Sequence, residues 1–110
     1  MSTIAGGSYH GFSGDGGPAI SAQLESNLPS LSVSPFGAVF FTDTSNSVIR
    51  VIDTAGNINT AVGIGLTPGS SGDMGSPTAA RLSSPYGVFV DINGVIYISD
   101  TWNNRIRKVY

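Results

Sequence analysis

The sequence predicts an all-β fold made of two copies of one four-stranded antiparallel unit. Short apolar segments alternate with turn residues along the whole chain, and 15 glycines and 6 prolines punctuate its 110 residues. A shift of 57 residues aligns 37–50 with 94–107, with Gly, Asp, Thr, Asn, Ile and Arg at matching places. Short strands that recur at a fixed period indicate a repeat architecture, so the two segments are expected to fold alike.

The predicted strands lie between tight turns, because Gly, Asn and Asp accept the backbone angles that turns require. The first unit has four such segments, at 31–34, 39–42, 48–52 and 58–62. The second unit has three, at 87–90, 95–99 and 105–110. The turn Asp43-Thr44-Ser45-Asn46 recurs as Asp100-Thr101-Trp102-Asn103. Units of this length with four short strands are typical of the blades of a β-propeller.

The segments before and between the two units also repeat. Ser13-Gly14-Asp15 aligns with 71–73 at an offset of 58 residues, and Thr3-Ile4-Ala5-Gly6 aligns with 60–63, the fourth strand. We therefore predict three parts, each described by its place in a blade. They are an outer strand at 1–6 donated to a neighbouring chain, a first blade with a long loop at 7–63, and a second blade with a long loop at 64–110 that lacks its own outer strand.

Several motifs carry a resemblance to a known family. They are Ser-Gly-Asp-Gly-Gly-Pro-Ala at 13–19, Pro-Tyr-Gly-Val at 85–88 and Tyr-Ile-Ser-Asp-Thr-Trp-Asn-Asn-Arg-Ile-Arg-Lys-Val at 97–109. With these motifs the chain resembles the NHL-repeat family over essentially its whole length, which implies a six-bladed β-propeller. Pro29-Ser30-Leu31-Ser32 departs from the usual Pro-x-Gly-Val, Ser47-Val48 replaces Asn-Arg, and Met74 and Ser76 interrupt the second Gly-Gly-Pro.

The second strand of each unit predicts that both faces of its sheet are covered. Val39-Phe40-Phe41 and Val95-Ile96-Tyr97-Ile98 show no polar alternation, which is typical of strands buried on two sides. Two blades alone would leave apolar outer faces at or above the roughly 300–600 Å² that monomers tolerate. We therefore predict a ring of identical chains with exchanged outer strands, a homotrimer of six blades being favoured over a tetramer of eight. The alternative is a piece cut from a longer propeller.

The long loops and the turns that share their face are the predicted binding surface, because loops on a rigid scaffold usually carry function. The candidate ligand-binding residues are Tyr9, His10, Phe12, Asp15, Asp73 and Trp102. Asp15 and Asp73 are expected to bond loop amides or to cap a helical turn, with a Ca²⁺ or polar-ligand loop as the alternative. Trp102 either packs on a loop or stacks on a partner such as a sugar ring.

Six recurring residues are interpreted as structural parts of each unit. They are Asp43, Asn46 and Arg50 in the first unit and Asp100, Asn103 and Arg107 in the second. The aspartates and asparagines suit a turn that every unit needs. The two arginines are expected to pair with a nearby carboxylate or with carbonyl groups rather than with a ligand.

The composition argues against several classes of function. Five basic and seven acidic residues give a net charge of −2, which disfavours nucleic-acid binding. The chain has no cysteine and a single histidine, His10, so no catalytic zinc site, other metal or cofactor is expected. No Ser-His-Asp motif is present, and no apolar run or leader indicates a membrane span or signal peptide, so an enzyme and a membrane partner are not expected and the compartment stays unassigned.

The function that these observations favour is a non-catalytic propeller scaffold or interaction module that assembles with itself and presents loops to an unidentified protein or small ligand. One alternative is a small-ligand or carbohydrate binder that uses Tyr9 and Trp102 as platforms. Another is an excised or engineered fragment with no selected function. Charged residues are only 11% of the chain, which fits strands buried on both faces.

Overall fold

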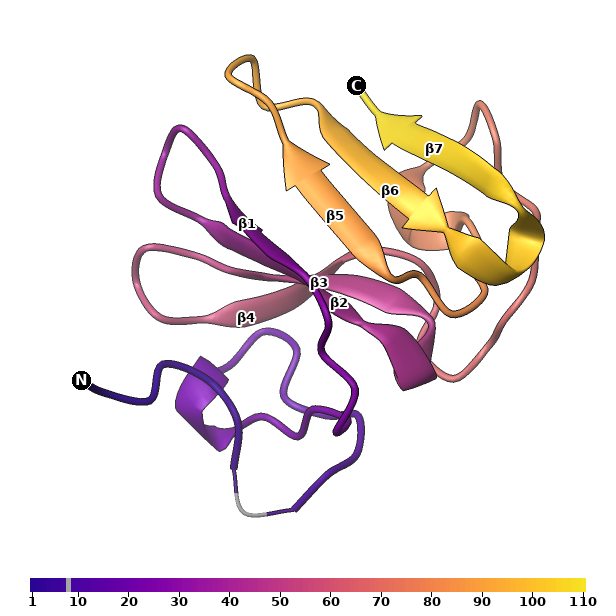
Figure 1. Cartoon of the computed structure of the whole chain (residues 1–110). Coiled ribbons are helices and arrows are strands. Elements are labelled where there is room, and N and C mark those ends of the chain that lie inside the picture. Colours follow the sequence, from indigo (N-terminus) through magenta and orange to yellow (C-terminus); the bar gives the residue numbers. More distant parts are fainter. Residues whose placement is uncertain (8) are drawn as a thin grey trace.

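The computed structural model describes residues 1–7 and 9–110 and consists of two antiparallel β-sheets (Figure 1). The first sheet has the order β1-β2-β3-β4 and the second β5-β6-β7. The strands are β1 (Leu31–Val33), β2 (Val39–Asp43), β3 (Val48–Ile52), β4 (Ile58–Val62), β5 (Gly87–Val90), β6 (Ile96–Asp100) and β7 (Arg105–Val109). The predicted all-β fold is thereby confirmed for a single chain, with the strands close to their predicted bounds.

Four short 3-10 turns connect these elements in the described part of the chain. They are η1 (Ala19–Ser21), η2 (Thr44–Asn46), η3 (Pro77–Ala79) and η4 (Thr101–Asn103). After η2 and η4, Ser47 and Asn104 adopt left-handed backbone angles with φ of 59° and 57°, which reverses the chain into β3 and β7. None of the helical turns described is long or apolar enough to cross a membrane.

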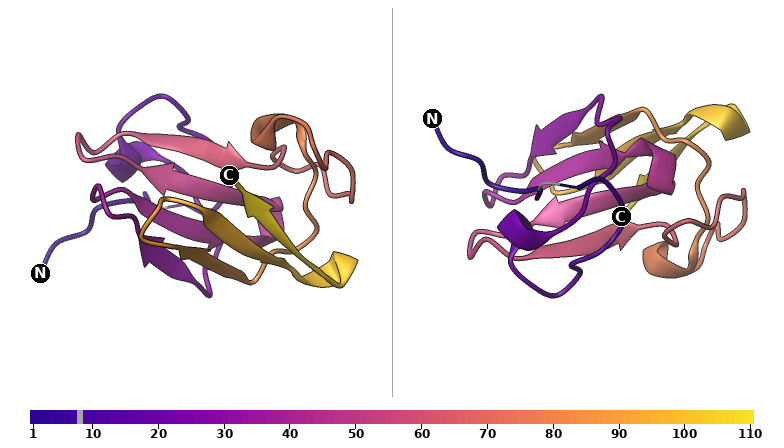
Figure 2. Two further views of the ribbon diagram at one scale, coloured as in Figure 1. Left: turned by 90° about the horizontal axis from the view of Figure 1, so that it is seen from above. Right: turned by 90° about the horizontal axis from the view of Figure 1, so that it is seen from below.

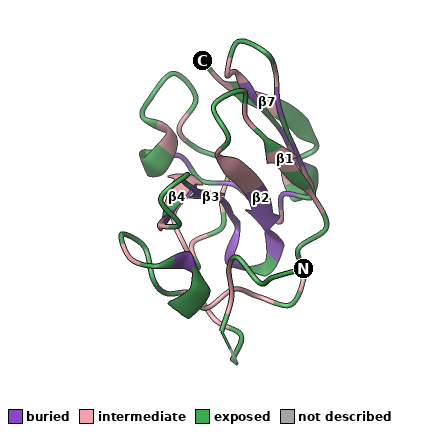
Figure 3. Cartoon of the chain, turned by 90° about the vertical axis from the view of Figure 1, so that its left-hand side faces the viewer, coloured by how far each residue is buried: buried purple, intermediate pink, exposed green. Residues whose placement is uncertain are grey.

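The second sheet lies against one face of the first, and Figure 2 shows the stacking in two further views. This interface holds a hydrophobic cluster to which both sheets contribute. Its buried members are Ile49, Val62, Leu82, Val88, Val90, Ile96 and Ile98, with Phe40, Ala61 and Val109 packed against them. In the first sheet, burial is concentrated on β2 and β3, whereas β1 is largely exposed (Figure 3). In the second sheet, the edge strand β7 is largely exposed.

The other face of the first sheet is covered in part by the N-terminal segment. Ala19 and Ala22 pack there against Phe41, Ile52 and Ile58 in a second buried cluster. Within the described residues, nothing covers the outer face of the second sheet, where Phe89 and other large apolar side chains are exposed. Each sheet therefore buries one face at the shared interface, while the outer face of the second sheet is open and that of the first is covered only in part.

The segment predicted to be an outer strand, residues 1–6, belongs to no strand in the single chain. Its later residues lie beside the open face of β1 and β2, where Ala5 packs against the second buried cluster, and the chain end projects from the molecule (Figure 1). The Gly6 amide donates to the Ala19 carbonyl over 3.0 Å, and the Gly63 amide at the end of β4 donates to the Pro77 carbonyl over 3.0 Å. The two segments thus join their following loops in the same way, although only β4 has a strand beside it.

Candidate functional site

The centre of the first unit is the guanidinium group of Arg50, which lies in the middle of β3 and is fully buried. Nη1 donates to the Gln23 carbonyl over 2.8 Å and to Asp43 Oδ2 over 3.4 Å. Nη2 donates to the Ser13 carbonyl over 2.8 Å and to Asp15 Oδ1 over 3.0 Å. We call this set of contacts the first arginine bracket, because it joins the long loop before β1 to the β2–β3 hairpin.

Asp43, at the end of β2, is the buried anion of the first bracket. Its Oδ1 accepts the Glu25 amide over 3.2 Å while Oδ2 faces Arg50. Burial raises the pKa of the Asp43 carboxyl above 3.8, and hydrogen bonds from Asn46 and the Glu25 amide and the charge of Arg50 oppose that rise. The carboxylate is therefore compensated by donors from three elements of the fold.

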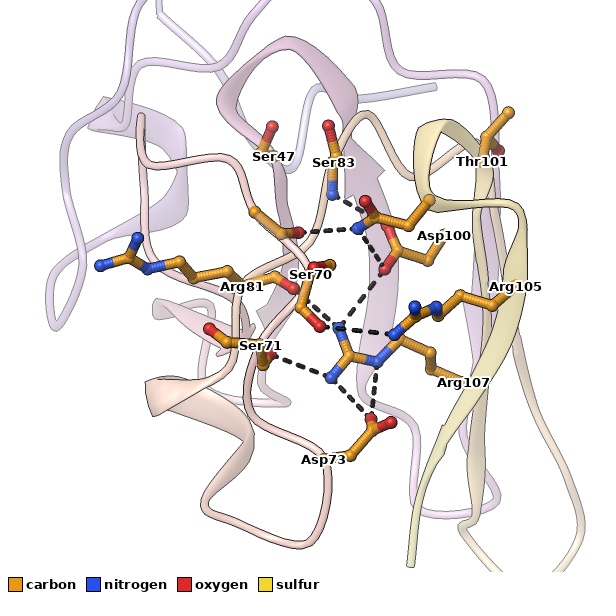
Figure 4. Close-up of polar contacts among 12 residues, drawn as sticks. Ser47, Ser70, Ser71, Asp73, Arg81, Ser83, Asp100, Thr101, Arg105 and Arg107 are labelled. Carbon is orange, nitrogen blue, oxygen red and sulfur yellow. Dashed lines mark hydrogen bonds and ion pairs between the residues drawn. The ribbon is translucent and has the colours of Figure 1, made fainter.

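The second unit contains a matching second arginine bracket around Arg107 in β7 (Figure 4). Nη1 donates to the Arg81 carbonyl over 2.7 Å and to Asp100 Oδ2 over 3.4 Å. Nη2 donates to the Ser71 carbonyl over 3.1 Å and to Asp73 Oδ1 over 2.7 Å. Each contact has its counterpart in the first bracket, so the repeat extends from the sequence to individual hydrogen bonds.

The asparagines that recur in the hairpin turns complete the two brackets. Asn46 Nδ2 donates to the Gly11 carbonyl over 3.0 Å, and Asn103 Nδ2 donates to the Gly69 carbonyl over 2.7 Å. The Phe12 ring adds to the first bracket, because its centroid lies 4.9 Å from the Arg50 guanidinium carbon. All three recurring residue types therefore hold a loop onto a hairpin in this structure.

Asp15 and Asp73 have other partners than the sequence predicts. Instead of loop amides, they contact the guanidinium groups of Arg50 and Arg107, and neither η1 nor η3 has a side-chain cap. Because each carboxylate already faces an arginine, a cation would have to displace that ion pair. Across residues 1–7 and 9–110, no group of three or more His, Cys, Asp or Glu side chains is placed to hold a metal ion.

The two brackets differ in the contacts of Asp15 and Asp73. In the first, Asp15 Oδ2 also accepts the hydroxyl of Thr60, which lies on β4, over 2.6 Å. In the second, Asp73 Oδ1 accepts both Nε and Nη2 of Arg107, and no strand lies outside β7 in the described structure. A cavity of about 330 Å³ opens there, lined by apolar side chains and by Asp73, Arg107 and Lys108. Its apolar lining comes from Val62, Met74, Pro77, Ala80, Leu82, Ile98, Val109 and Tyr110.

The aromatic and histidine candidates lie on the surface, in separate places. His10 Nδ1 is 2.8 Å from Glu25 Oε1, and both residues line a shallow groove with the exposed Tyr9. The lining of that groove includes neither Trp102 nor Asp73. Trp102 is 72% exposed in η4, and its backbone amide donates to the Ser83 carbonyl over 3.2 Å. The structure therefore does not gather these candidates into one site.

Sequence reasoning missed two serines that join the sheets. Ser30 Oγ accepts the Val88 amide over 3.1 Å, and Ser32 Oγ accepts the Val90 amide over 3.1 Å. Both serines lie within the segment where the first unit departs from the pattern of the second, in which Gly87 and Phe89 occupy the equivalent positions. That departure was the only signal in the sequence, and it marks a contact between units.

No family model and no curated protein matches the chain. Among solved structures, the chain is similar to a protein of unknown function from Bacteroides thetaiotaomicron, with a TM-score of 0.79 and 22% identity over 94% of this chain. It is also similar to an auxiliary nutrient binding protein from the same organism, with a TM-score of 0.73 and 24% identity over 97% of this chain. The chain spans 26% and 28% of the lengths of these two proteins. The likeness establishes a shared β-sheet fold.

Proposed function

We propose that the chain is a non-catalytic scaffold or interaction module that builds an NHL-type β-propeller by association of identical chains. Each chain would supply two blades, and three chains would close a six-bladed ring. One observation carries the proposal: residues at equivalent positions of the two units are buried where the units meet and exposed where they face away from each other. The two exposed faces carry apolar residues at the same positions as the two faces that pack together between the sheets.

The first exposed surface is the far face of β1 and β2. Leu31 and Val33 are 67% and 56% exposed, whereas their equivalents Val88 and Val90 are 7% and 6% exposed in the interface between the sheets. An apolar cavity of about 310 Å³ lies on this face, and we call it the acceptor face. Its sheet residues Leu31, Val39, Phe41 and Ile52 correspond to Val88, Ile96, Ile98 and Val109, which all belong to the inter-sheet cluster.

The second exposed surface is the outer face of β5, β6 and β7, which we call the donor face. Ile106 is 72% exposed, whereas its equivalent Ile49 is completely buried between the sheets. Tyr97 is 38% exposed, whereas its equivalent Phe40 packs against the inter-sheet cluster. A donor face of one chain on the acceptor face of the next would repeat the contact that already exists within each chain. Such a head-to-tail contact forms a ring when its rotation closes.

The mass of the protein in solution tests this proposal. By native mass spectrometry and light scattering, the chain is expected to form a particle of three times the 11.3 kDa mass of one chain. Ile106→Ser should shift the particle toward single chains, because it removes apolar area from the donor face. Ile92→Ser is the matched control, because Ile92 is 86% exposed in the β5–β6 turn and outside both faces. A wild-type protein that stays monomeric at high concentration contradicts the proposal.

A second candidate function is the binding of a small ligand or carbohydrate at the loops. Its supporting observation is Trp102, which is 72% exposed with its indole free to stack on a ring. Binding on a glycan array that is lost in Trp102→Ala and kept in Tyr110→Ala would support this function. Equal binding by both variants, or by neither, would argue against it.

A further inference from the structure

The cavity beside β7 has a counterpart in the first unit that is filled. There, β4 is hydrogen-bonded to β3 on one side and to the preceding loop on the other. The Gly16 amide donates to the Ile58 carbonyl over 2.8 Å, and the Ile58 amide donates to the Gly17 carbonyl over 2.9 Å. The Thr60 hydroxyl adds its 2.6 Å bond to Asp15. Loop residues 15–17 therefore bind the outer side of the fourth strand, β4, and we call such a strand-binding surface the seat.

The second unit preserves this seat without a strand in it. Met74 and Gly75 stand at the positions of Gly16 and Gly17, and Gly75 repeats the turn, since its amide donates to the Gly72 carbonyl over 3.1 Å as that of Gly17 does to Gly14 over 2.9 Å. Met74 has a left-handed φ of 70°, close to the 86° of Gly16. Met74 is fully exposed, and the outer edge of β7 borders the cavity of about 330 Å³.

The carboxylate of Asp73 is set to receive a hydroxyl group. Its Oδ1 accepts both donors from Arg107, so Oδ2, which corresponds to the Asp15 atom that binds Thr60, has no recorded partner within the described structure. Asp73 is also more exposed than Asp15, with side-chain exposures of 68% and 39%. A missing fourth strand therefore accounts for both differences: Asp73 has no hydroxyl partner equivalent to Thr60, and its side chain is more exposed than that of Asp15.

The chain itself carries a segment that matches this seat. Thr3-Ile4-Ala5-Gly6 aligns with 60–63, so Thr3 takes the place of Thr60. The Gly6 amide makes the same bond to its following loop as the Gly63 amide. Figure 1 shows the N-terminus at the opposite end of the molecule from β7, so a chain does not place this segment in its own seat.

We infer that the seat formed by 72–80 and Arg107 beside β7 binds residues 2–6 of a second copy as a fourth strand, with the Thr3 hydroxyl donating to Asp73. This inference rests on the proposed ring and names the residues that would join neighbouring chains; we call this contact the latch. By the register of β3 and β4, in which Arg50 faces Thr60 and Val51 faces Asn59, Thr3 would face Arg107 and Ser2 would face Lys108. Main-chain pairing at an open sheet edge supplies the affinity, and the Thr–Asp bond sets the register.

A disulfide cross-link tests the register directly, since the natural chain has no cysteine. In the full chain, Ser2→Cys combined with Lys108→Cys is expected to form covalent dimers and higher species under mild oxidation. Ser2→Cys combined with Ser45→Cys is the control, because Ser45 is exposed in η2 and faces no strand edge. The latch is supported when only the first pair forms intermolecular links, and it is overturned when both pairs form them equally or neither does.

A second measurement tests the hydroxyl bond. Thr3→Val should raise the concentration at which the ring dissociates by about tenfold, because a hydrogen bond to a charged group is lost. Asp73→Asn should have a similar effect, and the double variant should add little beyond either single change. Ser45→Ala, at an exposed position in η2 outside the proposed contacts, is the control and should leave dissociation unchanged. A ring that forms but is unaffected by Thr3→Val overturns the latch alone, whereas a chain that never assembles overturns the proposed function with it.

Discussion

Arg50 and Asp15 form an ion pair of 3.0 Å that joins the third strand of the first sheet to a loop 35 residues earlier in the chain. The arginine side chain is fully buried, while the aspartate side chain keeps 39% of its surface exposed. Together with Asp43, which is completely buried, the pair places one guanidinium between two carboxylates in an otherwise apolar region. Because a buried charge is tolerated only when it is paired and hydrogen-bonded, the loop fold and the strand fold depend on each other.

Replacing Arg50 by Met is expected to destabilise the protein by about 3–5 kcal/mol, because it leaves the buried carboxylate of Asp43 without its cation. Arg105→Met is the matched control, since Arg105 is exposed and makes one long contact of 3.4 Å with the Ser70 carbonyl. It should change stability by no more than about 0.5 kcal/mol. Urea unfolding followed by circular dichroism measures both, and equal losses would contradict a special role for the first bracket.

The stability of the protein should carry a pH dependence from Asp43. Because burial raises the pKa of this carboxyl above 3.8 in the folded state, the folded protein holds a proton at a pH where the unfolded chain has released it. The contribution of Asp43 is then largest below pH 3.8 and falls as the pH rises through the raised pKa. Asp43→Asn lacks this titration, so the stability of the wild type relative to the variant should fall over that range in urea unfolding series. A relative gain by the wild type would contradict the direction of the shift.

Ser30→Ala should weaken the contact between the two sheets. The substitution leaves the part-buried Val88 amide without its 3.1 Å acceptor, which costs about 1–2 kcal/mol. Ser45→Ala, at an exposed position in η2, is the control and should be nearly neutral. Hydrogen exchange gives a sharper readout, because the Val88 amide should lose protection selectively in Ser30→Ala. Unchanged exchange at Val88 would show that the serine contributes little.

Gly14 should tolerate a side chain less well than Gly16, although both have left-handed backbone angles. A Cβ on Gly14 would lie 2.8 Å from the Ala22 Cα, whereas one on Gly16 would meet nothing within 4 Å. Gly16→Ala is expected to cost about 1–2 kcal/mol from its φ alone, and Gly14→Ala more, because backbone must also move. Thermal unfolding of the two variants gives the order, and the reverse order would mean that the loop is not packed on Ala22 in solution.

The fold followed closely from the sequence because strands and turns leave local signals. Turn residues bound every segment that became a strand, and the repeat located the second sheet from the first. Residues 1–6 are the exception, because the repeat predicts a strand there whereas the single chain forms none. A strand needs a hydrogen-bonded neighbour, and local sequence pattern does not report whether one is present.

The site was less accessible to sequence reasoning, because its contacts connect residues far apart in the chain. Asp15 and Arg50 recur as Asp73 and Arg107 at nearly the same separation, which was the available signal. Sequence pattern suggested turns for the aspartates, since an aspartate among glycines usually bonds nearby amides. Only the folded chain shows that each loop returns to the third strand of its own unit.

The serine contacts of β1 make the two units unequal. Ser30 and Ser32 bind the amides of β5 across the interface within a chain, but Gly87 and Phe89 occupy those positions on the opposite end of the molecule. In the proposed ring, contacts between the two sheets of one chain would therefore alternate with contacts between neighbouring chains, and the latter would lack these two hydroxyl groups. A circular permutant that begins in the second unit would exchange the covalent and non-covalent joints, and its assembly would have to rely on the serines in place of the peptide chain.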